Sequence, residues 1–249
     1  GAYLLDHGDG AQDRLESFLR DEKITDREML TGSLTVYQTL RTGEDNDLLP
    51  PILIDASWEQ RRTPGWGGTL TYGADIQGHI RSSDADVAGR DALRLGASWD
   101  WHDSHVLPVG LVVETRLGMT LDHYSYWDDS TASDTTHARA YGAATLRYPL
   151  MRQTARATHI LEPVVQLGWV GTSGTAPVNE DSTATEFDQA NLLSLSRFAG
   201  EDASETGAQA AIGLSWTRQT PQGWQSRLTF GRVYRDTAAN DYTHTSGLD

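Results

Sequence analysis

The chain has 249 residues, of which 38% are hydrophobic, and a formal net charge of -15 at pH 7. Because binding to phosphates requires concentrated lysine and arginine, this charge excludes a nucleic acid as the partner. The absence of cysteine excludes a disulfide framework and a cysteine-based metal site. The sequence has no run of about 18 apolar residues, so it predicts no transmembrane helix.

Apolar and polar residues alternate with a period of two along most of the chain, and glycine, tryptophan and tyrosine are plentiful. This pattern predicts an all-β fold of about ten long antiparallel strands. The expected ranges are 12–20, 28–40, 50–61, 66–81, 90–101, 106–124, 137–150, 157–171, 205–219 and 222–235.

The range 106–124 illustrates the length of these strands and the difference between their two faces. Leu117, Met119 and Leu121 share one face, whereas Glu114 and Arg116 share the other. Strands of soluble sandwiches average about five or six residues, and strands of this length are typical of a membrane barrel with lipid on one face and a polar lumen on the other. The predicted lumen-facing residues are Arg94, Glu114, Arg116, Arg139, Arg147 and Glu162.

The connections between the expected strands alternate in length, which orients a barrel because short turns belong to the periplasmic rim. The ranges 62–65, 102–105, 153–156 and 220–223 are short, and 82–89, 125–136 and 172–203 are long and mostly acidic. We therefore expect the long connections on the extracellular side. Acidic loop residues such as Asp128 and Asp129 are interpreted as solvated, with a cation-bridged contact to phosphorylated lipid as an alternative.

His102, Asp103, Ser104 and His105 have the residue types of a catalytic triad and a His-x-x-His metal spacing. No third ligand and no oxyanion donor lies near them in the sequence, so they are interpreted as a polar turn. The sequence predicts no catalytic residue, no metal site and no cofactor.

The stretch from Phe187 to Gly207 does not alternate, yet it is too apolar for an idle surface loop. We expect it to fold inward over the lumen, with Leu192, Leu195 and Phe198 against the inner wall or a plug. Hydrogen bonds to barrel side chains are expected from Asp188, Asn191, Arg197 and Asp202.

This stretch, together with Pro177–Ser182 before it, resembles the signature region of the LptD family, the lipopolysaccharide-assembly (organic solvent tolerance) proteins. The flanking residues 159–163 and 246–249 are also similar to the family. The sequence of the chain is similar to those of the alphaproteobacterial members. The signature residues carried over are Phe187, Asp188, Asn191, Leu192, Leu195, Arg197, Phe198, Gly200, Asp202, Glu205 and Gly207.

The resemblance implies an outer-membrane barrel of a Gram-negative bacterium that inserts lipopolysaccharide into the outer leaflet without covalent chemistry. Residues 1–249 would be a middle part of that barrel domain, without its N-terminal jelly roll and closing strands. The implied partners are an LptE-like lipoprotein plug, an LptA-like periplasmic bridge acting through the jelly roll, and lipopolysaccharide. Two alternatives stay open at this point: a ten-stranded outer-membrane barrel enzyme and a soluble β-sandwich adhesin.

Overall fold

The computed structural model describes residues 14–40, 46–47, 49, 51–181, 187, 190–198 and 200–236. These residues form eleven strands. Their bounds are β1 (Arg14–Ile24), β2 (Glu28–Thr39), β3 (Ile52–Arg62), β4 (Thr69–Ile80), β5 (Asp91–Val106), β6 (Val112–Trp127), β7 (Thr135–Arg147), β8 (Leu150–Gln153), β9 (Thr158–Gly174), β10 (Gly207–Gln219) and β11 (Gln225–Arg235). Among the residues that the structure describes, no helix is long and apolar enough to cross a membrane.

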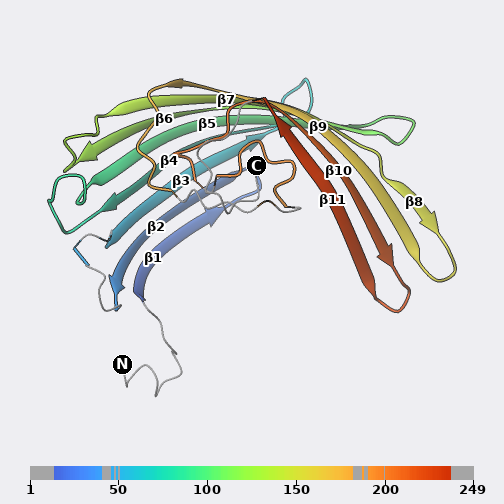
Figure 1. The fold of residues 1–249 in the computed structure, drawn as a ribbon, viewed down its shortest axis with the longest axis horizontal. Helices are drawn as coiled ribbons and strands as arrows, with labels where there is room; N and C mark the ends of the chain where they lie inside the picture. Colours follow the sequence, from blue (N-terminus) through green and yellow to red (C-terminus); the bar gives the residue numbers. More distant parts are fainter. Residues whose placement is uncertain are drawn as a thin grey trace, which may run out of the picture. The chain divides into compact units, whose positions relative to one another are not determined.

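The strands follow the order β1-β2-β3-β4-β5-β6-β7-β9-β10-β11, and the short β8 pairs with β9. The prediction of an all-β, antiparallel fold is confirmed. The chain divides into two compact units, one of 1–62, 71–98 and 121–137, the other of 63–70, 99–120 and 138–249. Within the second unit β8 to β11 lie side by side (Figure 1).

The register of the second unit gives β9, β10 and β11 one apolar face and one polar face. On the apolar face Val165 lies opposite Ile212, and Leu214 lies between Pro163 and Phe230. Ile212 is 50% exposed and Phe230 is 68% exposed, so this face is an uncovered apolar surface. Such a surface is unusual for a soluble protein and is the one that a lipid-facing sheet requires.

The polar face of the same strands carries most of the buried apolar side chains of the second unit. Val164 and Val170 of β9 and Ala211 of β10 are buried there, together with Leu192 of the segment that connects β9 to β10. The small core of the second unit therefore lies between this connecting segment and the sheet.

Several predicted strand boundaries differ from the observed ones; the expected strand 12–20, for example, continues to Ile24, and two other differences have a clear local cause. His102 to His105 were expected in a short turn but lie in β5, and the turn follows at Leu107–Leu111. The alternation of apolar residues across 107–111 resembles a strand, but Pro108 has no N–H to donate and Gly110 takes a φ of 84°. The expected strand 137–150 also ends early, at Arg147, and β8 follows as a separate short strand after Pro149.

The apolar face gives a paired test on neighbouring residues of β10. Leu214→Arg places a guanidinium on the apolar face, whereas Ser215→Arg places it on the polar face opposite Glu162. In hydrocarbon an arginine near the midplane costs about 2–4 kcal/mol. We expect Leu214→Arg to lower the amount of folded protein in the membrane, measured by heat-modifiable mobility on gels, and Ser215→Arg to leave it near the parent level. Equal behaviour of the two variants would contradict the assignment of faces.

Candidate functional site

Ion pairs cross neighbouring strands on the polar face of the second unit. Arg147 of β7 donates from Nε to Glu114 of β6 at 3.0 Å and from Nη1 to Glu162 of β9 at 3.2 Å. Arg116 of β6 donates to Asp100 of β5 at 2.6 Å, and Tyr141 donates its hydroxyl hydrogen to the same carboxylate at 2.9 Å. Each of these arginines thus lies beside at least one carboxylate.

The first unit repeats this arrangement. Arg94 of β5 donates to Asp75 of β4 at 2.7 Å and lies 3.8 Å from Asp122 of β6. Gly96 leaves room for the Asp75 carboxylate, since a Cβ there would lie 2.4 Å from its oxygen. The arginine side chain is 12% exposed, so the pairing compensates for the desolvation of its charge.

The segment between β9 and β10 (residues 175–206, hereafter the β9–β10 segment) is attached to the sheet through Leu192. Gly213 and Gly231 lie directly opposite one another on β10 and β11. A Cβ on either glycine would come within 2.7 Å or 2.6 Å of the Leu192 side chain. The two glycines therefore form a socket on the polar face that admits this leucine, whose exposure is 5%.

A second leucine of the segment uses a third glycine. A Cβ on Gly168 of β9 would lie 2.4 Å from Cδ2 of Leu195. Gly168 lies opposite Gln209 in the register, and Gln209 donates from Nε2 to the Ser194 carbonyl at 3.3 Å. Glycine on the polar face is thus where the apolar side chains of the segment approach the backbone of the sheet.

Buried charges hold the end of the same segment. Glu205 accepts hydrogen bonds from the Arg197 backbone N–H at 3.0 Å, from Arg197 Nη1 at 2.8 and 2.9 Å, and from Arg235 Nη1 of β11 at 2.9 Å. The side chains of Arg197 and Glu205 are 1% and 4% exposed. The Arg197 guanidinium also lies over the Phe187 ring, 5.8 Å from its centroid. The three residues Arg197, Glu205 and Arg235 are called the buried triad below.

Further contacts fix the middle of the segment. The Asp181 carboxylate accepts from the Asp202 backbone N–H at 3.1 Å, and the Asp202 carboxylate accepts from the Glu180 backbone N–H at 3.0 Å. Gly200 lies so close to Asp181 that a Cβ there would overlap the carboxylate. Arg139 of β7 pairs with Glu201.

The structure brings together most of the predicted signature residues. Leu192, Leu195, Arg197, Gly200, Asp202 and Glu205 make the contacts above, Gly207 begins β10 with a φ of 93°, and Asn191 and Phe198 are half-buried. Asp188 falls outside the described residues. Gly168, Gly213, Gly231 and Arg235 were not among the predicted site residues. The sequence does contain a signal for these glycines. They occur in successive strands on the face that otherwise carries polar side chains, which indicates a close approach to the backbone there.

His102 and His105 do not form a site with one another. His105 Nε2 lies 2.6 Å from Asp103, and His102 Nδ1 lies 3.9 Å from Asp100. Within the described part of the chain, no three histidine, aspartate or glutamate side chains are placed to hold a metal ion.

Two of the long connections also lock together, at the ends of β4 to β7. Asp86 accepts from the backbone N–H and the hydroxyl of Ser130, both at 2.7 Å. Arg90 Nη2 lies 2.5 Å from the Asp129 carboxylate. Hydrogen bonds from Thr131, together with Arg90, lower the pKa of Asp129 from 3.8 to about 2. Both Asp86 and Asp129 are thus used in protein contacts.

The contact between these connections is expected to depend on pH. Because the pKa of Asp129 is lower in the folded protein, its contribution is complete above about 3.8 and is lost as the pH falls toward about 2. We expect amide hydrogen exchange at Thr131 and Ala132, corrected for its intrinsic pH dependence, to rise over that window. In the Asp129→Asn variant, the amides of Thr131 and Ala132 should already exchange quickly at neutral pH. Their exchange should then show no rise as the pH falls from about 3.8 to about 2. A wild-type profile that stays flat between these pH values would refute the assignment.

The glycine socket is tested by filling it. Gly231→Ala or Gly213→Ala should push Leu192 out, because an added methyl group would overlap its side chain, and overpacking of this kind costs about 1–3 kcal/mol. Gly32→Ala on β2 is the matched control, since a Cβ there meets nothing within 4 Å. In proteins that also carry Ser194→Cys, maleimide labelling should increase in the two socket variants and not in the control. Unchanged labelling in the socket variants would show that the segment does not depend on this contact.

The comparison with protein-family models identifies the chain. The LptD family model, described as LPS transport system D, matches residues 5–247. No curated protein matches the chain. The match spans nearly the whole sequence, and it excludes both the enzyme and the soluble adhesin, because members of this family are transport barrels of the Gram-negative outer membrane. The chain therefore belongs to the LptD family, whose outer-membrane barrels assemble and transport lipopolysaccharide.

Proposed function

We propose that the polar face of the strands lines the lumen of a lipopolysaccharide translocon and that the apolar face contacts lipid. The proposal rests on the pairing of charges on one face and the exposure of apolar side chains on the other. A lumen that holds water or protein tolerates paired charges, whereas hydrocarbon does not. The proposed lumen-facing residues are Arg94, Glu114, Arg116, Arg139, Arg147 and Glu162.

In this arrangement the β9–β10 segment is an inward element that an LptE-like lipoprotein plug packs against. The observation that carries this role is the burial of Leu192 and Arg197 against the polar face, which keeps the segment on the lumen side of the wall. The signature residues then act as structural residues of the plug seat and not as a site of chemistry. The long connections that join β4 to β5, β6 to β7 and β9 to β10 lie on the extracellular rim.

We also propose that residues 1–249 belong to a larger barrel domain. Among the residues that the structure describes, β1 and β11 are the ends of the strand order. In hydrocarbon both would need a partner strand, because unpaired backbone groups cost several kcal/mol each. Further strands would supply those partners. A jelly roll in the same protein would receive lipopolysaccharide from an LptA-like periplasmic bridge and deliver it to the barrel.

The role of the inward segment is tested in the full-length protein with Leu192→Ser, Leu195→Ser and Phe198→Ser combined. Because burial of one leucine side chain stabilises by about 1.5–3 kcal/mol, the triple change should release the segment from the wall. We expect less lipoprotein to copurify with the barrel and the outer membrane to admit large antibiotics. Val109→Ser, in an exposed turn (69% exposed), is the control. If the triple variant folds and both readouts match the parent, the segment is not the plug seat.

A further inference from the structure

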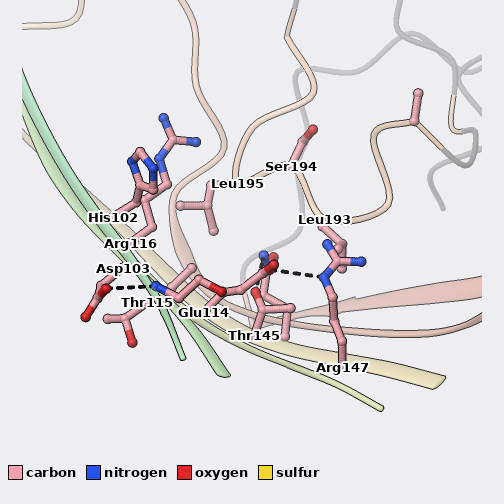
Figure 2. A pocket seen from close by; sticks show the side chains of 14 residues that line it. His102, Asp103, Glu114, Thr115, Arg116, Thr145, Arg147, Leu193, Ser194 and Leu195 are labelled. Carbon is pink, nitrogen blue, oxygen red and sulfur yellow. Dashed lines mark hydrogen bonds and ion pairs between the residues drawn. The ribbon is translucent and has the colours of Figure 1, made fainter. Parts of the chain in front are cut away.

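A cavity of about 400 Å³ lies in the second unit between the β9–β10 segment and the polar face of β5, β6, β7 and β9. Figure 2 shows Leu193, Ser194 and Leu195 of the segment on one side and Glu114, Thr145 and Arg147 of the strands on the other. A volume of this size is at the lower end of the range for ligand sites, about 300–1,000 Å³. It holds a short stretch of peptide more readily than a whole lipid.

The charge around this cavity is negative. Besides Asp103, whose carboxylate pairs with His105, three carboxylates, those of Asp100, Glu114 and Glu162, line it or bind the arginines that line it, against the two guanidinium groups of Arg116 and Arg147. Each guanidinium already lies beside at least one of these carboxylates. An anionic group entering the cavity meets a net repulsion, and a cationic group meets an attraction.

The carboxylates can accept more hydrogen bonds than Arg147 supplies. Glu114 and Glu162 each accept from Arg147 through one oxygen, and an ionised carboxylate has about four acceptor positions. Their side chains are 40% and 32% exposed. Glu114, which lines the cavity, therefore remains accessible to a donor that enters it, and Glu162 holds Arg147 from the neighbouring strand.

The opposite side of the cavity is apolar and fixed. Leu195 is held over Gly168, and Leu193 follows Leu192, which occupies the glycine socket. The buried triad anchors the same segment a few residues further on. A stationary apolar side facing a row of acceptors complements a long alkyl chain that ends in a cation, which describes arginine and lysine side chains.

From these observations we propose that the cavity binds a short segment of the partner protein in the lumen, which inserts one arginine or lysine side chain. Its alkyl stem packs on Leu193 and Leu195, and its cationic head donates to Glu114. The inference rests on the proposed function, because the polar face has to line the lumen and a protein has to occupy it. An anionic lipid headgroup is the competing occupant, and the charge balance disfavours it.

The test uses the full-length protein in cells, with the photo-crosslinking residue p-benzoylphenylalanine at Leu193. Ultraviolet light should link this position to a protein that copurifies with the barrel. Glu114→Gln should lower the crosslink yield about ten-fold, since a hydrogen bond between two charged groups is replaced by a weaker one to a neutral amide oxygen. Glu162 still pairs with Arg147 in that variant, and heat-modifiable mobility checks its folding. Asp55→Asn is the control, because Asp55 lies on β3 outside this cavity and opposite Ser33.

The outcomes separate the inference from the function on which it rests. A crosslink to lipopolysaccharide in place of protein would overturn the inference and assign the cavity to lipid. So would a protein crosslink that Glu114→Gln leaves unchanged, or one that Asp55→Asn lowers equally. If a protein copurifies with the barrel but Leu193 forms no crosslink, the inference fails and the proposed function stands. If no protein copurifies, both fail.

Discussion

Glu205 is the residue on which the arrangement of the β9–β10 segment depends. Its carboxylate accepts from Arg197 within the segment and from Arg235 on β11, so that one buried anion joins the connection to the wall. Removing one partner of a buried ion pair typically costs about 3–5 kcal/mol, because the remaining charge is left uncompensated, although such a pair is seldom better for stability than apolar packing. What the buried triad provides is a single position for the segment.

That single position explains the glycines of the sheet. A segment tied down at Arg197 and Glu205 brings Leu192 to one point on the polar face, and there β10 and β11 both lack a Cβ. Any larger residue at Gly213 or Gly231 would lift the leucine and strain the ion pairs that follow it. The glycine socket and the buried triad are therefore coupled, although the contact in the socket is apolar and the triad is ionic. The glycine socket and the buried triad together fix the distance between the segment and the sheet. The cavity beside Leu193 and Leu195 is the space left between them.

The sequence predicts the strands well because period-two alternation reports directly which face of a strand is buried. It places Arg147, Glu114 and Glu162 on one face, but their pairing depends on the register between three strands, which no local pattern contains. The same holds for the socket, since Gly213 and Gly231 become neighbours only when β10 and β11 pair. At Pro108 and Gly110 the local pattern was misleading, because apolar residues at alternate positions can equally line a turn.

The charges on the polar face limit what this part of the wall can do for a phosphorylated lipid. An arginine attracts phosphate when its guanidinium has donors and charge to spare. Arg94, Arg116, Arg139 and Arg147 each lie beside a carboxylate, and in the buried triad Arg197 and Arg235 share the Glu205 carboxylate. The overall charge of -15 makes the surroundings of these pairs still less favourable to an anion. Arginines paired in this way have little charge left for a phosphate, which is consistent with the proposal that this face meets a protein.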